Sequence, residues 1–222
     1  MLINAIIFDM DGVLTDSMKY HIKSWNYAFN QFNIFPSDED FALLEGMSYK
    51  ETIEFISNKY NVKLNQIEKD KIYSIKKDKL SEIFHFEIYP DIPNFLKFLK
   101  KQNLKLALVS GANKEFVNSI INKFFKNCFE IIITGSDVKK GKPNPEPYLK
   151  AIDKLGCKTD NIIVIENSPL GIESAKKSKL QTFALTTTLD KKYLKEADKI
   201  FFSHDELIEY IKTLTGQNKT SP

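Results

Sequence analysis

Short apolar runs alternate with longer amphipathic stretches along most of the chain. Six runs have the length and β-branched character of buried strands, the last of them weaker; they span residues 2–8, 104–109, 131–134, 162–165, 182–185 and 199–202. Five stretches carry helical periodicity, at residues 92–101, 114–125, 145–155, 169–178 and 205–214, and the polar tail at 215–222 is expected to fray. This alternation predicts an α/β fold, a doubly wound parallel sheet with helices on its faces.

Residues 17–87 break the alternation. Apolar and aromatic residues recur there at helical spacing, Tyr20 and Trp25 among them, and no convincing strand is present. An insertion directly after the first strand lies at the carboxyl edge of the sheet, where open α/β folds bind their ligands. We therefore predict a helical cap domain at 17–87 and a core domain made of 1–16 and 88–222.

The composition is that of an ordinary folded protein of 222 residues, 42% hydrophobic and 27% charged. Lys and Arg number 32 against 29 Asp and Glu, and the net charge of +3 is spread along the chain, so nucleic acid is not expected as a partner. We interpret the lysine pairs at 76–77 and 139–140 as solvated faces.

The expected location follows from features that the sequence lacks. The only cysteines, Cys128 and Cys157, have no metal-binding spacing and are too few for a disulfide framework. Residues 2–8 run directly into Asp9 and Asp11, which the apolar region of a signal peptide would exclude. No apolar stretch reaches the roughly 18 residues of a membrane span. We expect a cytoplasmic monomer without a membrane partner.

Two acids, Asp9 and Asp11, stand at the mouth of the first predicted strand. Side chains alternate along an extended strand, so both acids face one ligand only if the chain turns, and Gly12 permits that turn. Two crowded carboxylates repel each other unless a cation or solvent offsets their charge. The alternative is a purely structural role, since acidic turns and helix caps are common.

Other predicted strands also end in small polar or charged residues. These are Ser110-Gly111, Gly141-Lys142-Pro143 in the loop after the third strand, and Glu166-Asn167-Ser168. In a parallel sheet all of them would line one crevice. Each has a plainer interpretation: Ser110 as a cap for the helix beginning near Asn113, Lys142 as a surface lysine, and Glu166 to Pro169 as a helix start.

Together these segments resemble the haloacid dehalogenase superfamily, in particular its capped group of β-phosphoglucomutases and small phosphatases. Residues 9–13, Ser110, Lys142 and the Glu166-Asn167 pair match the four motifs of that superfamily in order, each after a predicted strand. The resemblance spans nearly the whole chain and implies a phosphate-ester substrate.

The resemblance also implies roles for the matched residues. Asp9 would be the nucleophile that forms an aspartyl-phosphate, and Asp11 the general acid and base. Ser110, with neighbouring backbone N–H groups such as that of Gly111, would hold the phosphoryl oxygens, and Lys142 would neutralise charge.

A Mg²⁺ cofactor is implied as well, held by the Asp9 carboxylate, the Asp11 carbonyl, Glu166 and Asn167. The family pattern usually has an aspartate where this chain has Asn167. Because an amide brings no negative charge, we expect weaker metal binding unless Glu166 compensates.

The predicted lid decides between hydrolase and mutase. His21 and Trp25, four residues apart on one helix face, match positions near the mutase's catalytic pair, although packing inside the lid would also explain them. Gly46 and Lys50 belong to a segment that matches the mutase's lid loop, but Tyr49 replaces its phosphate-binding arginine.

After the second strand, Ala112 and Asn113 replace a serine and a lysine of the mutase. We therefore favour a Mg²⁺-dependent phosphatase of a small phosphorylated metabolite, with sugar phosphates as the favoured class. The alternatives are a β-phosphoglucomutase and a catalytically silent module that binds a phosphorylated metabolite.

Overall fold

The computed structural model of the chain describes residues 2–216 and contains a six-stranded sheet in which every neighbouring pair of strands is parallel. The strand order is β3-β2-β1-β4-β5-β6. The strands are β1 (Ala5–Phe8), β2 (Lys105–Val109), β3 (Ile131–Ile133), β4 (Ile162–Glu166), β5 (Gln181–Leu185) and β6 (Lys199–Phe201). All six predicted strands are present, and the doubly wound α/β class is confirmed.

Successive side chains of each strand point to opposite faces of the sheet. In β1, Ile6 and Phe8 pack on the side of α5, α6 and α9, whereas Ala5 and Ile7 pack on the side of α7 and α8. These helices are α5 (Ile92–Lys101), α6 (Lys114–Phe124), α7 (Glu146–Leu155), α8 (Pro169–Lys177) and α9 (His204–Gly216), with short 3₁₀ helices η1 (Gly135–Asp137), η2 (Thr159–Asn161) and η3 (Lys191–Tyr193). All four residues of β1 are buried, and Asp9, the ionisable residue that directly follows the strand, lies at the edge of the sheet.

Helix α9 extends further than the sequence predicts. It continues to Gly216, and within it Thr215 is buried, its hydroxyl donating to the Ile211 carbonyl at 2.9 Å. The expected fraying is therefore wrong for Thr215, because the helix continues through it and its side chain is buried. The rest of that prediction, residues 217–222, lies outside the described residues.

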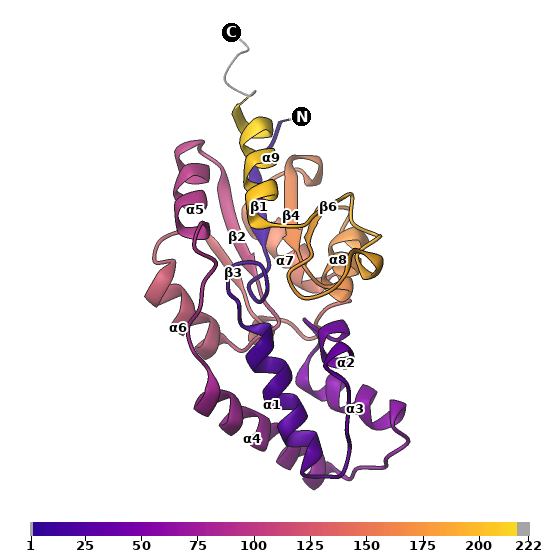
Figure 1. Cartoon of the computed structure of the whole chain (residues 1–222). Coiled ribbons are helices and arrows are strands. Elements are labelled where there is room, and N and C mark those ends of the chain that lie inside the picture. The colour runs from indigo at the N-terminus through magenta and orange to yellow at the C-terminus, as the bar shows by residue number, and fades with distance from the viewer. Residues whose placement is uncertain (1, 217–222) are drawn as a thin grey trace.

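Between β1 and α5 the chain forms four helices and, within residues 17–87, no strand. They are α1 (Met18–Asn30), α2 (Asp38–Leu43), α3 (Tyr49–Lys59) and α4 (Gln66–Ile83). They enclose a hydrophobic cluster of their own, which includes Phe29, Ile53 and Ile72. Figure 1 shows them gathered beyond one end of the sheet, opposite the chain termini. We propose that 17–87 form a helical cap on a core of 1–16 and 88–222.

Three of these four helices begin with a reciprocal capping box. Ser37, Ser48 and Asn65 each accept from a backbone N–H three residues later, and the acidic side chain at that position accepts from the cap residue's own N–H. Such a box satisfies two helix-end donors at once and fixes where the helix starts. The cap at Ser48 fixes the end of the loop that contains Gly46.

Two features bear on the expected location. Within residues 2–216 no helix has both the length and the apolar character that a bilayer crossing requires. Cys128 and Cys157 are both free thiols. The cytoplasmic location and the monomeric state stay predictions.

Candidate active site

The chain turns sharply after β1, and this turn brings both acids to one cavity. Gly12 has a φ of +83°, in the left-handed region that favours glycine. Its N–H donates to the Thr15 carbonyl at 2.8 Å, and the Leu14 N–H donates to the Met10 carbonyl at 2.9 Å. Asp9 and Asp11 therefore both line a cavity of about 570 Å³ between the sheet edge and the helices of the cap.

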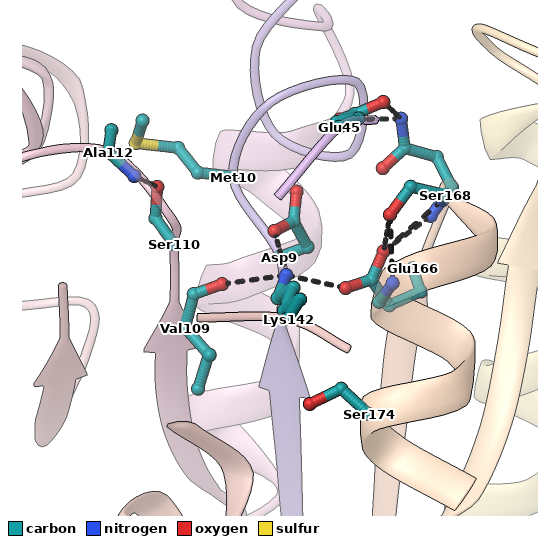
Figure 2. Close-up of polar contacts among 12 residues, drawn as sticks. Asp9, Met10, Glu45, Val109, Ser110, Ala112, Lys142, Glu166, Ser168 and Ser174 are labelled. Atoms are coloured by element: carbon teal, nitrogen blue, oxygen red, sulfur yellow. Dashed lines mark hydrogen bonds and ion pairs between the residues drawn. The ribbon is translucent and has the colours of Figure 1, made fainter. Parts of the chain in front are cut away.

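Lys142 is a buried cation at the centre of the site. Its ammonium donates to Asp9 Oδ1 at 2.5 Å and to Glu166 Oε1 at 2.6 Å, and only 1% of its side chain is exposed. Figure 2 shows it between these two carboxylates, with the Val109 carbonyl on its other side. Burial alone would lower the pKa of Lys142, but Asp9 and Glu166 raise it, so the group stays charged. The interpretation as a surface lysine is wrong.

Glu166 is held too firmly to act as a free ligand. Oε1 accepts from Lys142 and from the Tyr148 hydroxyl at 2.7 Å, while Oε2 accepts from the N–H groups of Asn167 and Ser168 and from the Ser168 hydroxyl. Gly171 packs so closely that an added Cβ would lie 1.9 Å from Oε1. In this geometry Glu166 orients Lys142 rather than offering the metal an oxygen.

Two buried oxygens in the site have no hydrogen-bond partner. They are Asp9 Oδ2 and Asn167 Oδ1, in residues that are 5% and 0% exposed. Burial raises the pKa of Asp9, an effect that Lys142 opposes and Glu166 and Asp11 reinforce. Such oxygens cost free energy unless something binds them, and hard oxygen donors suit Mg²⁺.

In the described part of the chain, no group of three His, Cys, Asp or Glu side chains is arranged to hold a metal. The donors implied by the resemblance are of mixed kind, with the Asp11 carbonyl and the Asn167 amide oxygen beside the Asp9 carboxylate. The donor chemistry fits Mg²⁺, and its presence stays a prediction.

Ser110 lies at the end of β2, buried and lining the cavity with Gly111. Its hydroxyl accepts from the Ala112 N–H at 3.1 Å. The cap of α6 is instead Asn113, whose side chain accepts from the Phe116 N–H at 2.9 Å. The structure thus excludes the helix-cap alternative for Ser110 and leaves its hydroxyl in the site.

The cap contributes two adjacent basic side chains, His21 and Lys76, of which only His21 was predicted from the sequence to lie in the site. His21 Nδ1 lies 3.2 Å from the Lys76 ammonium, and His21 Nε2 lies 3.7 Å from Asp11 Oδ1. Burial lowers the pKa of Lys76 to about 8, and burial followed by the Lys76 charge lowers the pKa of His21. The expectation that Lys76 lies on a solvated face is wrong, because α4 packs this side against α1 above the cavity.

The other predicted cap residues differ in their placement. Trp25 lines the cavity with its ring 5.3 Å from the Lys76 ammonium, and Gly46 lines it from the loop before α3. Lys50 is exposed and lies outside the cavity wall, so the geometry does not support its predicted substrate-binding role. The wall is formed there by Tyr49, stacked on Tyr73 with ring centroids 3.7 Å apart.

Glu45 is a second residue of the site, besides Lys76, that sequence reasoning missed. It precedes Gly46 in the cap loop, is 8% exposed, and accepts two hydrogen bonds from Asn167 Nδ2, at 2.9 and 2.8 Å. Burial, and next the charge of Asp9, raise the pKa of Glu45 well above its usual value. The signal in the sequence that could have found Glu45 is Asn167. Because an amide stands where the family pattern usually has an aspartate, another acid near the site is needed to supply the missing charge.

Comparison with known proteins gives concordant matches. A family model described as haloacid dehalogenase-like hydrolase matches residues 6–185. A phosphorylated carbohydrates phosphatase from Thermotoga maritima is 26% identical over 214 residues, which cover 94% of this chain and 98% of the relative. Pyrophosphatase PpaX from Oceanobacillus iheyensis is 28% identical over 222 residues, covering 96% of each chain. The solved structure of beta-phosphoglucomutase from Clostridium difficile has a TM-score of 0.83 and 27% identity, covering 99% of this chain and 100% of that one.

Proposed function

This chain belongs to the haloacid dehalogenase-like hydrolase family, and from that premise we propose that it is a Mg²⁺-dependent phosphatase of a small phosphorylated metabolite. The family and the phosphatases among its relatives support an enzyme that acts on phosphate esters. The observation that carries the proposal is the Asp9 carboxylate, which is bonded through one oxygen to the buried Lys142 ammonium and has its other oxygen free. Lys142 offsets part of the repulsion between this carboxylate and a phosphate dianion.

The reaction would have two steps. In the first, an Asp9 oxygen attacks phosphorus, the bond from phosphorus to the ester oxygen breaks, and Asp11 gives that oxygen a proton. In the second, water attacks the phosphorus of the aspartyl-phosphate, the bond from phosphorus to the Asp9 oxygen breaks and frees the carboxylate, and Asp11 takes up a proton from that water. Burial raises the pKa of Asp11, the direction that a general acid needs, although the Ser17 hydroxyl, which donates to Asp11, opposes this. Ser110 and the N–H groups of its loop would hold the phosphoryl oxygens.

Mg²⁺, when bound by the Asp9 carboxylate, the Asp11 carbonyl and the Asn167 amide oxygen, would neutralise negative charge on the phosphoryl group. Cap helices that cover the cavity would exclude bulk water during the transfer.

A phosphomutase is the second candidate. A mutase must hold two phosphates, and Lys76 and Lys77 of α4 both line the cavity across from the sheet edge. Phosphatase activity stays the first choice, because Tyr49 and the exposed Lys50 leave the matched lid loop without an arginine or a buried cation.

The test is a panel of phosphate esters and pyrophosphate, assayed for phosphate release with and without Mg²⁺. We expect Mg²⁺-dependent release from at least one sugar phosphate and none from the Asp9→Asn variant. Glucose 6-phosphate that forms from β-glucose 1-phosphate faster than free phosphate would indicate the mutase. Ligand binding without release in either protein would indicate a binding module.

A further inference from the structure

We propose that Glu45, carried by the cap, supplies the cation site with the negative charge that Asn167 does not bring, so that cation binding holds the cap on the core. The inference rests on the proposed function only in taking Mg²⁺ as the cation. Glu45 of the cap would then supply the negative charge, and Asn167 of the core would supply a neutral oxygen to the cation.

The first support is the match between the two side chains. One amide nitrogen of Asn167 donates to both oxygens of Glu45, at 2.9 and 2.8 Å, and a third bond joins it to the Thr188 hydroxyl at 3.0 Å. An aspartate at this position would place carboxylate against carboxylate, which is unfavourable in a buried site. The presence of Asn167 is therefore tied to the presence of Glu45.

The second support is a set of free oxygens beside this pair. The Asn167 side chain bonds to Glu45 through its nitrogen, Nδ2, so its oxygen, Oδ1, is left buried and without a partner. Asp9 Oδ2 is also buried without a partner. In Figure 2 the Asp9 oxygen that is not bonded to Lys142 points toward Glu45. A cation placed among these oxygens would satisfy atoms that otherwise have no partner.

The third support is the balance of charge. The carboxylates of Asp9 and Glu45 lie within electrostatic reach of each other and of Asp11 and Glu166. The ammonium groups of Lys76 and Lys142 are the opposing charges. When all are ionised, the formal excess is two negative charges. A divalent cation cancels this excess, and without Glu45 the site would carry one charge too few for it.

The cap loop explains how Glu45 is held in place. Gly46, with a φ of +86°, leaves no room for a side chain, because an added Cβ would lie 2.8 Å from Lys142 Cδ. A Cβ on Gly111 would lie 2.9 Å from the Gly46 carbonyl oxygen, so this loop rests directly on the core. Glu45 can therefore reach the cation site only while the cap is closed.

The experiment measures cation binding directly, by calorimetric titration of the substrate-free protein with Mg²⁺, repeated with Mn²⁺. We expect Glu45→Gln to weaken binding by about 10-fold or more, the size typical of losing a group that supports a metal site. The double variant Glu45→Gln/Asn167→Asp, which moves the charge from cap to core, is expected to bind within about 3-fold of the unmodified protein, since 3-fold is under 1 kcal/mol.

Glu39→Gln is the matched control, because Glu39 is an acid of the same cap that contacts Tyr193 of η3 and does not line the cavity. It is expected to leave affinity unchanged. Unchanged affinity in Glu45→Gln would overturn the proposal, as would failure of the double variant to regain binding. If Glu45→Gln does not fold, the double variant alone decides. Binding within about 3-fold of the unmodified protein then supports the proposal, and weaker binding overturns it. Phosphatase activity is not part of this readout, so an inactive protein whose cation binding needs Glu45 would refute the proposed function and leave this inference standing.

Discussion

Lys76 illustrates how the surroundings of one side chain can set a pH dependence. It is buried on the side of α4 that faces the cavity. Its charge faces Asp11 of the loop after β1, and His21 and the Trp25 ring contact it from α1. Burial lowers the pKa of this lysine from 10.5 to about 8, so the ammonium loses its proton as the pH rises through that value.

We therefore expect kcat/KM for a phosphate ester to fall above about pH 8, because a cation that faces the substrate's negative charge is lost. Lys76→Arg should remove this fall, since arginine keeps its charge at every pH of the assay. Lys77→Arg, a change at the neighbouring cavity lysine, serves as the control and should keep the fall. The measurement is a pH profile of kcat/KM, and an unchanged profile in Lys76→Arg would contradict the assignment.

Residues differed in how well the sequence could predict their position. Asp9, Ser110 and Lys142 were placed in one crevice because each follows a strand, and strand ends of a parallel sheet share an edge. Glu45 and Lys76 were missed because their positions depend on how the cap folds over that edge. In sequence, a lysine on an amphipathic helix has the same pattern whether its helix face meets water or a cavity.

At the scale of elements, the cap helices are joined by a buried acid. Asp40 of α2 accepts from the Ser37 N–H at 2.9 Å and the Tyr60 hydroxyl at 2.7 Å, and it pairs with Lys59 of α3. Burial would raise the pKa of Asp40, but these bonds lower it to about 2. Stability from the ionised form is thus present above the ordinary value of 3.8 and is lost as the pH falls toward 2.

We expect Asp40→Asn to lower the free energy of unfolding by about 1–3 kcal/mol at pH 7, the usual cost of leaving partners of a charged group unpaired. The difference from the unmodified protein should narrow below about pH 4, the ordinary range of an aspartate. Asp38→Asn, at an exposed acid of the same helix turn, should cost less than about 1 kcal/mol. Denaturant unfolding at several pH values checks this, and a pH-independent difference would count against the ionised carboxylate as the cause.

Elements were the most predictable level of this structure. The five helices after the insertion and all six strands lie where periodicity predicted them, because apolar spacing and prolines mark their boundaries. The exception is the end of α9, where Thr215 belongs to the helix although it looked like part of a polar tail. Its burial depends on distant packing, which local composition does not show.

At the scale of the whole molecule, the cap meets the core across glycines. Gly111 of the core lies under the carbonyl of Gly46, and its own φ is outside the left-handed region, so the core backbone would accept an alanine there. The obstacle is the opposing loop, because the added Cβ would lie 2.9 Å from the Gly46 carbonyl oxygen and this backbone atom would have to shift.

We expect Gly111→Ala to lower kcat/KM by about 10-fold, because small misplacements of a closing element have large effects on rate. The melting temperature should change by less than about 4 °C, which corresponds to about 1–2 kcal/mol for a chain of this size. Gly216→Ala, where an added Cβ meets nothing within 4 Å, is the control; it should leave kcat/KM unchanged and should not lower the melting temperature. Full activity in Gly111→Ala would show that this contact does not matter for turnover.

The position of Trp25 has a practical consequence. It is the only tryptophan in the chain, and its indole lies in the cavity wall beneath a positively charged nitrogen. Intrinsic indole emission from this protein therefore comes from one known place. A polyanion that entered the cavity would change the electric field across that ring, so occupancy could be followed optically without attaching a dye.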